Sequence, residues 1–278
     1  MALDLHFMIN FGRIYSGVVG EYPHAKSLNF QRIPVLISVV VPVMNEEGNI
    51  AKLIAQISSA ATHAPITEII YIDDGSTDKT FEVLKSLEPQ YPILRIIQHS
   101  HRSGQSAGLL TGIKSATNEI IVTLDGDGQN DPADIPLVYE LYLKEKEKSD
   151  KVMVAGQRKK RQDNLGRRIA SRFANNLRSF LLRDKTRDTG CSLKMFSRTD
   201  YLNLPYFNHM HRFLPALMIR DGIKIAHVDV SHRPRTSGTS KYTNLNRAIV
   251  GITDLMGVMW LQRRPHALPK ITEYKNKG

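Results

Sequence analysis

The sequence predicts an α/β fold in which helices cover the faces of a mainly parallel sheet. From residue 35 onward, short apolar runs rich in β-branched residues alternate with segments of helical periodicity. The chain has 278 residues, of which 41% are hydrophobic and 23% charged, so it can bury a sizeable core. Polar motifs follow several of the predicted strands, which is where ligands gather in parallel sheets.

The predicted elements of the first half alternate regularly. The first strand covers residues 35–41 and ends at Pro42, and a helix follows over residues 46–61, where apolar residues recur every three or four positions. Further strands are predicted over residues 69–72, 94–97, 119–124 and 152–155, and further helices over residues 81–87 and 104–117. This order of strand and helix predicts crossover connections between parallel strands.

The second half is more basic. Arginine and lysine are frequent over residues 158–187, where a helix is predicted for residues 166–182. An alternating edge strand is expected over residues 223–230, and an amphipathic helix over residues 244–261. We therefore divide the chain into an N-terminal tail or prefix (1–34), a main domain (35–241) and an interface helix with a polar tail (242–278).

Charge and composition limit the partners. The chain has 38 Lys and Arg against 27 Asp and Glu, a net charge of +11, which indicates an anionic partner such as nucleic acid, a phosphorylated substrate or lipid headgroups. A single cysteine, Cys191, excludes an internal disulfide and favours a reducing compartment, and we expect it to be a packed thiol. No stretch reaches the ~18–20 apolar residues of a membrane span. The nearest, residues 248–261, contains Asp254.

Three acidic clusters follow predicted strands. They are Asn45-Glu46-Glu47, Asp73-Asp74-Gly75-Ser76-Thr77-Asp78 and Asp125-Gly126-Asp127-Gly128-Gln129. A lone cluster of this kind is usually a turn or a helix cap, but three at neighbouring strand ends would repel one another unless a cation or ligand hydroxyls compensated them. The hard oxygen ligands of Asp125, Asp127 and Gln129 suit Mg²⁺ or Mn²⁺, and substrate phosphates commonly complete such a site.

Residues 35–241 resemble the family 2 glycosyltransferases, which have the GT-A fold, and within them the polyprenyl-phosphate branch related to dolichol-phosphate mannosyltransferase. The resemblance rests on Pro42-x-x-Asn45-Glu46, Asp73-Asp74-Gly75-Ser76-x-Asp78, Asp125-x-Asp127-x-Gln129 and Arg235-x-x-Gly238-x-Ser240-Lys241. It implies an inverting, metal-dependent hexosyltransferase that uses a nucleoside-diphosphate sugar, with either UDP or GDP. The family often has an aromatic residue where this chain has Met44, which changes how the base would be covered.

The resemblance also implies roles for single residues. It implies donor binding by Pro42, Asn45, Glu46, Asp74, Asp125, Gln129, Arg235, Ser240 and Lys241, catalysis by Asp127, Arg235 and Lys241, metal binding by Asp125, Asp127 and Gln129, and acceptor-phosphate binding by Arg158, Arg167 and Ser171. Asp188 would position a sugar hydroxyl or an arginine. His209 and His211 form a His-x-His pair that is weak evidence for a metal site, and we interpret them as the lip of the sugar pocket or as packing at a helix start.

The implied acceptor is a polyprenyl phosphate, whose phosphate is largely dianionic at neutral pH because its second pKa is ~6. We therefore expect no essential catalytic base. The expected partners are the nucleotide sugar, the lipid phosphate and a membrane surface at the cytoplasmic face, with peripheral or monotopic attachment; a homo-oligomer is compatible with this. One alternative is a family 2 transferase that extends a saccharide hydroxyl in envelope polysaccharide synthesis. Another is a nucleic-acid-binding module, which we reject because no binding signature accompanies the basic residues.

Overall fold

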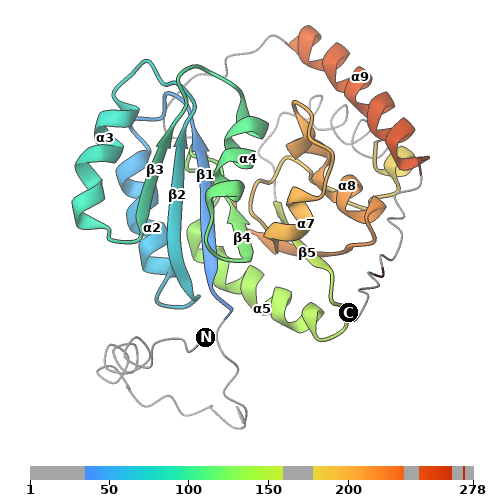
Figure 1. Cartoon of the computed structure of the whole chain (residues 1–278), viewed down its shortest axis with the longest axis horizontal. Helices are drawn as coiled ribbons and strands as arrows, with labels where there is room; N and C mark the ends of the chain where they lie inside the picture. Colours follow the sequence, from blue (N-terminus) through green and yellow to red (C-terminus); the bar gives the residue numbers. More distant parts are fainter. Residues whose placement is uncertain (1–34, 159–177, 235–243, 265–271, 273–278) are drawn as a thin grey trace, which may run out of the picture. The chain divides into compact units, whose positions relative to one another are not determined.

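The computed structural model describes residues 35–158, 178–234, 244–264 and 272. By their internal contacts, the residues fall into two units, 1–34 and 35–278, and the description below concerns the second unit. Its described part contains one sheet of seven strands in the order β3-β2-β1-β4-β6-β5-β7 (Figure 1). The strands are β1 (Ile37–Val43), β2 (Ile66–Asp73), β3 (Leu94–Gln98), β4 (Ile120–Thr123), β5 (Val152–Arg158), β6 (Lys194–Ser197) and β7 (Lys224–Val230).

The sheet is mixed because one strand runs against its neighbours. Strands β1 to β4 are parallel to one another, and β5 is parallel to β7. Strand β6 lies between β4 and β5 and is antiparallel to both. The carboxyl ends of β1, β2 and β4 therefore meet at one edge, as the sequence predicted, and β6 joins this parallel half to β5 and β7.

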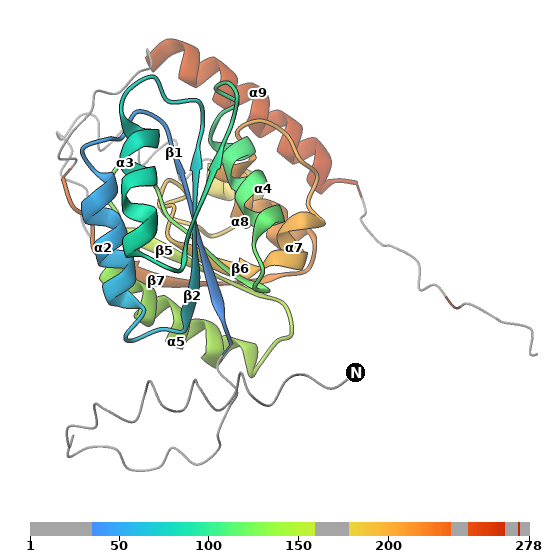
Figure 2. The ribbon, with the colours of Figure 1, turned by 60° about the vertical axis from the view of Figure 1, so that its left-hand side comes forward.

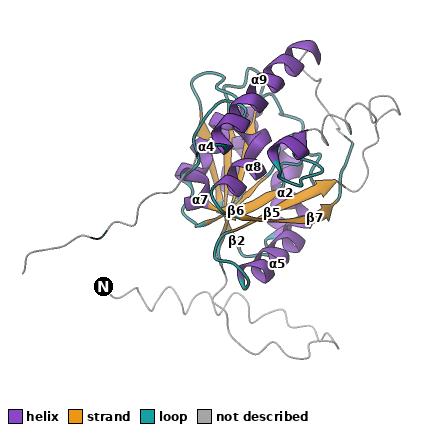
Figure 3. Cartoon of the chain, turned by 90° about the vertical axis from the view of Figure 1, so that its right-hand side faces the viewer, coloured by secondary structure: helices purple, strands orange, loops and turns teal. Residues whose placement is uncertain are grey.

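Helices cover both faces of the sheet (Figures 2 and 3). The helices are α2 (Ile50–Ala60), α3 (Thr80–Leu87), α4 (Gln105–Ser115), α5 (Ile135–Lys146), α7 (Arg198–Leu202), α8 (Leu214–Arg220) and α9 (Asn244–Gln262), with short 3-10 turns η1 (Glu88–Gln90), η2 (Pro132–Asp134) and η3 (Met210–Phe213). Buried residues of α2, α3 and α5 pack on one face, and those of α4, α7, α8 and α9 pack on the other.

The middle of strand β1 shows why a central strand can have a continuous apolar run. Val39 and Val41 pack into the first cluster, whereas Val40 points to the opposite face and packs into the second. All three are fully buried. Burial of each such side chain contributes about 1.5–3 kcal/mol. A strand covered on both faces therefore has a continuous apolar run and not an alternating one.

The predicted boundaries need several corrections. Strand β1 continues through Pro42 to Val43; its pairing with β4 ends at Val40, so the proline, which lacks an N–H, lies beyond that ladder. Helix α2 begins at Ile50 and not at residue 46, because residues 46–49 form a turn in the site described below. Helix α5 and strand β6 were not predicted. Of the helix predicted over residues 166–182, only residues 178–182 are described, and they are helical.

Helix α9 agrees with the predicted amphipathic segment to within one residue. Val258 is buried against the domain, whereas Ile252, Met256 and Trp260 are exposed. Among the described residues, no helix combines the length and the apolar character that a bilayer span requires.

Candidate active site

Asn45 joins the ends of β1 and β2. Its backbone has a left-handed φ of 53°, a conformation that asparagine adopts more readily than most residues. Its Oδ1 accepts a hydrogen bond from the Thr77 amide at 2.8 Å, and its own amide donates to Ser76 Oγ at 2.9 Å. These bonds fix the first acidic cluster against the second, which the sequence had only placed at neighbouring strand ends.

The two glutamates after Asn45 extend this contact. The Glu46 amide donates to Thr80 Oγ1 at 2.9 Å, and Glu46 Oε2 accepts a hydrogen bond from Asn49 Nδ2 at 2.7 Å. Glu47 Oε2 accepts from the Lys79 amide at 2.9 Å. The loops after β1 and β2 thus form one hydrogen-bonded unit beside Pro42. Contacts of Pro42, Asn45 and Glu46 with a nucleoside stay predictions.

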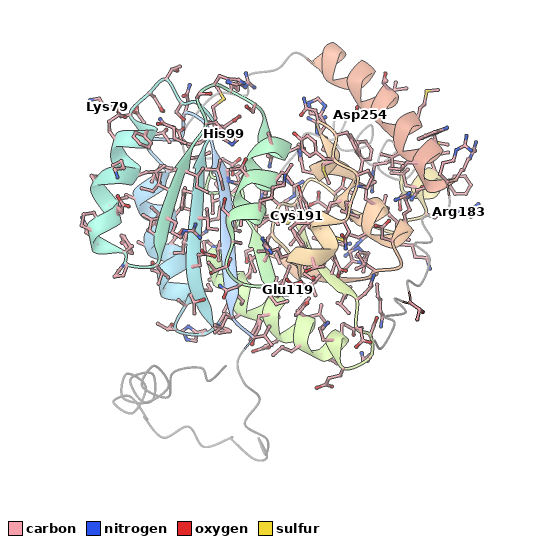
Figure 4. All side chains as sticks on the ribbon, viewed as in Figure 1. Lys79, His99, Glu119, Arg183, Cys191 and Asp254 are labelled. Atoms are coloured by element: carbon pink, nitrogen blue, oxygen red, sulfur yellow. The ribbon has the colours of Figure 1, made fainter. Side chains whose placement is uncertain are left out.

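Asp74 holds the loop that leads into α4. Its Oδ1 accepts hydrogen bonds from the Ser103 amide at 2.8 Å and lies 2.8 Å from His99 Nδ1, while its Oδ2 accepts from the Gly104 amide at 2.7 Å. Gly104 has a φ of 93°, which favours glycine at this turn. The sequence pointed to Asp74 as a nucleotide contact but missed its partner His99, which Figure 4 shows at the same end of the sheet.

The third acidic cluster lies beside these loops. Asp125 Oδ1 accepts a hydrogen bond from Gln105 Nε2 at 2.6 Å, and Asp127 Oδ1 accepts from the Gln129 amide at 3.1 Å. A side chain at Gly126 would collide with Val43, so the glycine lets this segment approach β1 closely. Burial, together with the nearby charge of Asp127, raises the pKa of Asp125 to about 6. The two carboxylates repel each other, and a cation would relieve that repulsion.

The donor set suits the metal that the resemblance implies. Within the described part of the chain, no three His, Cys, Asp or Glu side chains come together as a metal cluster. Asp125 and Asp127 supply two carboxylates, with the Gln129 side chain beside them in the sequence. Mg²⁺ is typically held by one or two carboxylates together with substrate phosphates and water. The residues present therefore fit a metal that is completed by a diphosphate.

The residues that follow β7 are bonded to residues 129–131, where the third acidic cluster ends. Asn130 and His232 form an antiparallel bridge, and the Arg233 amide donates to the Gln129 carbonyl at 2.9 Å. The Arg233 side chain lies 2.5 Å from Asp131 Oδ2. The sequence did not single out Arg233 or Asp131, because their contact joins positions about a hundred residues apart. The predicted donor-binding residues Arg235, Ser240 and Lys241 lie outside the described residues.

Arg158, the predicted ligand of an acceptor phosphate, forms a bidentate ion pair with Asp188. Arg158 Nε lies 2.5 Å from Asp188 Oδ2, and Nη2 lies 2.6 Å from Oδ1. Burial alone would lower the pKa of Arg158, but the hydrogen bonds and charge of Asp188 outweigh it and raise that pKa. The expectation that Asp188 positions an arginine is confirmed. Arg167 and Ser171 lie outside the described residues.

A cavity of about 190 Å³ opens between Asp125 and the segment that carries Asp188. Its walls include Asp125, Gly190, Lys194, His211 and Arg212, and Asp125 is the only acidic residue among them. Burial lowers the pKa of Lys194, whose Nζ donates to the Cys191 carbonyl. Burial also lowers the pKa of His211 to about 3, so its ring is neutral at physiological pH. Among the charged residues that the structure describes on this wall, Lys194 and Arg212 outnumber the carboxylate of Asp125.

Cys191 and the two histidines behave as the sequence suggested. Cys191 is a free, buried thiol at the centre of the domain (Figure 4), and burial raises its pKa. His211 lines the cavity, and His209 is the residue that precedes η3. The position of His209 directly before η3 agrees with the helix-start alternative, and a place for either histidine at the lip of a sugar pocket stays a prediction.

Comparison with known proteins identifies the family. The family model described as glycosyl transferase family 2 matches residues 38–204, which include all three acidic clusters. This chain belongs to glycosyl transferase family 2. The motif-based prediction is therefore confirmed.

The names of two relatives of this family 2 glycosyltransferase each include a polyprenyl phosphate. It is 36% identical over 233 residues to a dodecaprenyl-phosphate galacturonate synthase of Rhizobium johnstonii, a match that covers 82% of this chain and 67% of the relative. It is 31% identical over 212 residues to an undecaprenyl-phosphate 4-deoxy-4-formamido-L-arabinose transferase of Pectobacterium carotovorum, covering 75% of this chain and 63% of the relative. The chain thus spans about two thirds of the length of the relatives that it matches.

Solved structures confirm the predicted fold of the family 2 domain. Glucosyl-3-phosphoglycerate synthase from Mycobacterium tuberculosis, crystallised with Mn²⁺, UDP-glucose and phosphoglyceric acid, superposes with a TM-score of 0.62 at 19% identity. The match covers 82% of this chain and 79% of that one. At this level of identity the likeness concerns the fold, which is of the GT-A type.

Proposed function

We propose that this family 2 glycosyltransferase transfers a sugar from a nucleoside-diphosphate sugar to the phosphate of a polyprenyl lipid, with inversion at the anomeric carbon. The observation that carries the proposal is a small cavity whose wall brings Asp125 together with the cations Lys194 and Arg212. Gly190 on the same wall lies against Arg158, which is paired with Asp188. The names of the two relatives, both of which act on polyprenyl phosphates, support the same acceptor.

The loops after β1, β2, β3 and β4 would form the donor side, which comprises residues 42–49, 73–80, 99–105 and 125–131. Backbone and side-chain hydrogen bonds already fix these loops to one another. Pro42 and Glu46 would line the nucleoside, and Asp74 would keep the loop before α4 in place beneath it. Arg235 and Lys241 would contact the diphosphate from the segment that follows the Arg233–Asp131 ion pair. Fixed donor groups of this kind lower the cost of reorganisation during the reaction.

The acceptor side comprises Arg158, residues 188–194 and residues 209–214. The ion pair with Asp188 orients the Arg158 guanidinium, and Arg167 and Ser171 would complete the phosphate site. A lipid phosphate is a charged nucleophile near neutral pH, since its second pKa is ~6. It needs positioning more than deprotonation. Among the described residues of the cavity wall, Asp125 is the one carboxylate. Transfer to a saccharide hydroxyl would instead need a general base.

Mg²⁺ or Mn²⁺ held by Asp125, Asp127 and Gln129 would supply charge stabilisation for the departing diphosphate. Asp127 would contribute the second carboxylate of that site, while Gln105 holds Asp125 in place through its amide. The arginines would act on the opposite side, where the acceptor phosphate enters. The residues of this chain thus divide the work of binding two anionic reactants.

We also propose that α9 attaches the enzyme to the cytoplasmic face of a membrane. Ile252, Met256 and Trp260 are spaced four residues apart and are each at least 58% exposed, so they form one apolar stripe. Arg264 lies over the Trp260 ring at 5.2 Å. Apolar side chains beside arginines favour an anionic bilayer surface. The single, reduced cysteine agrees with a cytoplasmic location.

The test of the reaction uses the purified full chain, Mn²⁺, and a panel of UDP- and GDP-sugars. The acceptors are a short-chain prenyl phosphate, the matching prenyl alcohol and free oligosaccharides. We expect product with the prenyl phosphate alone, in the anomeric configuration opposite to that of the donor. Product from oligosaccharides but not from the prenyl phosphate would replace this proposal with transfer to a saccharide hydroxyl.

Attachment is tested with vesicles of zwitterionic lipid and vesicles containing anionic lipid. Trp260 is the only tryptophan, so its fluorescence reports on α9 directly. We expect a blue shift and co-sedimentation with anionic vesicles, both reduced in the Met256→Gln variant. Identical behaviour of the wild type with and without vesicles would contradict membrane attachment through α9.

A further inference from the structure

We propose that α9 is part of the active site: Asp254 is a positioning residue that acts through His209 to hold the cavity wall formed by η3. The inference rests on the proposed function where it is tested by enzyme kinetics, whereas its test by hydrogen–deuterium exchange is independent of that function. It connects two sequence features that the reaction itself leaves unused, a carboxylate in the middle of an apolar helix and the first histidine of the His-x-His pair.

Asp254 faces the domain and not the solvent. Its side chain is 18% exposed, and Figure 4 places it on the side of α9 that faces the body of the domain. Its Oδ2 is buried, has no hydrogen-bond partner among the residues that the structure describes, and lies 3.3 Å from His209 Nδ1. A buried carboxylate oxygen is costly unless a charge or a donor compensates it. The imidazole of His209 is the group placed to do so.

His209 is held in an uncommon backbone conformation directly before η3. Its φ is 66°, in the left-handed region, and its amide donates to Asn208 Oδ1 at 2.9 Å. Such a conformation is strained and persists where surrounding contacts impose it. The contact with Asp254 is one of the contacts that hold His209 in this conformation. A change in α9 would therefore alter the residue that directly precedes η3.

The next residues of η3 reach the cavity. His211 Nδ1 lies 2.8 Å from Ser106 Oγ, and both His211 and Arg212 line the cavity. Ser106 is the neighbour of Gln105, which donates to Asp125. Successive contacts therefore lead from α9 through η3 and the start of α4 to a predicted metal ligand. The position of α9 on the domain sets the position of the cavity wall.

This arrangement gives α9 two roles. Its outer stripe is the surface that we propose to bind lipid, while Asp254 on its inner side braces the pocket in which the sugar would lie. An enzyme whose acceptor is embedded in a bilayer would gain from this, because the helix that contacts the lipid surface also shapes the site. Detachment of α9 from the domain would loosen His209 and with it the cavity wall.

The test compares Asp254→Asn, His209→Asn and the double variant in the full chain. Asparagine preserves the size of Asp254 and tolerates the left-handed backbone at His209. We expect each single variant to lower kcat/KM for the donor sugar about 5- to 10-fold, and the double variant to be no worse than the poorer single one, because coupled residues are not additive. Glu88→Gln, which breaks an exposed ion pair with Lys85 far from the cavity, is the matched control and should leave kcat/KM unchanged.

Hydrogen–deuterium exchange supplies a readout that needs no activity. We expect faster exchange in residues 209–213 of both single variants, with the sheet unaffected, and a change in Trp260 fluorescence. Wild-type exchange and wild-type kcat/KM in Asp254→Asn would overturn the inference. Faster exchange throughout the domain would also overturn it, because Asp254 would then serve stability alone. If the wild type fails with every acceptor, the proposed function is wrong, while the exchange data still decide the role of Asp254.

Discussion

The donor and acceptor sides of the cavity are built from different interactions. On the donor side, the loops are joined mainly by short side chains that accept hydrogen bonds from backbone amides, as Asn45 does from Thr77 and Asp74 from Ser103 and Gly104. On the acceptor side, ion pairs between long arginines and aspartates predominate, such as Arg158 with Asp188. Short side chains bonded to backbone lose little conformational entropy, whereas each arginine must be held in one of many rotamers.

This difference indicates how each side recognises its ligand. The nucleotide part is the same in every donor sugar of one class. Loops held rigid by hydrogen bonds to backbone amides can therefore be shaped to bind it. The phosphate of a lipid arrives from a membrane on a flexible chain. Arg158 has five N–H donors, so the guanidinium that Asp188 orients still has donors with which to bind that phosphate. Asp188 limits the freedom of Arg158 without neutralising the basic character of the cavity, since Lys194 and Arg212 are also on its wall.

The largest effect is expected for the donor side. Asp127→Asn removes one of the two carboxylates of the proposed metal site and should lower turnover by at least ~10²-fold, in line with the loss of other preorganised electrostatic groups. The Mn²⁺ concentration for half-maximal activity should rise as well. Steady-state kinetics across a Mn²⁺ titration measures both, and Asp150→Asn, at an exposed position after α5, serves as the control. Near-normal turnover of Asp127→Asn with Mn²⁺ present would contradict the assigned role.

For the acceptor side we expect a smaller kinetic effect, which concerns the KM of one substrate. Asp188→Asn leaves Arg158 in place but removes its charged partner, and hydrogen bonds to charged groups contribute about 1.5–3 kcal/mol. We expect the KM for prenyl phosphate to rise about 10-fold while the KM for the nucleotide sugar changes little, since 1.4 kcal/mol corresponds to a factor of ten. Initial rates measured with each substrate varied separately make the distinction. An equal rise in both KM values would show that the two sides are not independent.

The donor side was largely predictable from the sequence because its signals are local. The acidic clusters follow apolar strands directly, and parallel strands bring their carboxyl ends together. Asn45, Asp74, Asp125 and Asp127 were therefore placed correctly at one edge of the sheet. Their partners were not, because His99 and Gln105 carry no pattern of their own and meet the carboxylates only after the chain has folded.

The acceptor side was less predictable for a physical reason. Strand β6 is four residues long and begins with Lys194, which is buried, so neither its length nor its hydrophobicity marks it as a central strand. Helix α5 was missed because charged residues interrupt its apolar face, including Glu145, which pairs with lysines 148 and 224. On the donor side, the contact of Arg233 with Asp131 was missed as well, because it joins positions about a hundred residues apart. Such contacts follow from tertiary structure and not from local sequence.

The opposite end of the donor half provides a third test, which concerns stability. Glu68 on β2 accepts hydrogen bonds from Ser38 and Arg95 and, at 3.0 Å, from the Thr117 amide. Burial alone would raise the pKa of Glu68, but these bonds outweigh it and lower that pKa. A lowered carboxyl pKa stabilises the fold above the pKa of the unfolded chain and ceases to do so as the pH falls through the folded value. Glu68→Gln should therefore cost about 1–2 kcal/mol at pH 7.

Urea unfolding at a series of pH values measures this contribution. The difference in unfolding free energy between the wild type and Glu68→Gln should be full above about pH 5 and should shrink below about pH 4, near the ordinary glutamate pKa of ~4.3. The matched control is Glu88→Gln, whose ion pair is exposed on both sides. A difference that stays constant from pH 7 to pH 3 would mean that Glu68 acts through packing and not through its charge.

The smallest effect is expected at Cys191, which lies where the two sides meet. Its side chain is 1% exposed, Asn130 Nδ2 lies 3.5 Å from its Sγ, and burial raises its pKa, so it is a protonated thiol at neutral pH. We expect Cys191→Ala to keep kcat/KM within about 3-fold of the wild type, because 1 kcal/mol or less of lost packing barely moves the cavity wall. The native thiol should resist alkylation until urea unfolds the chain. The opposite result would be rapid alkylation of the native enzyme, with a loss of turnover that the nucleotide sugar prevents. Cys191 would then be part of the site, and the donor and acceptor sides could no longer be treated as separate.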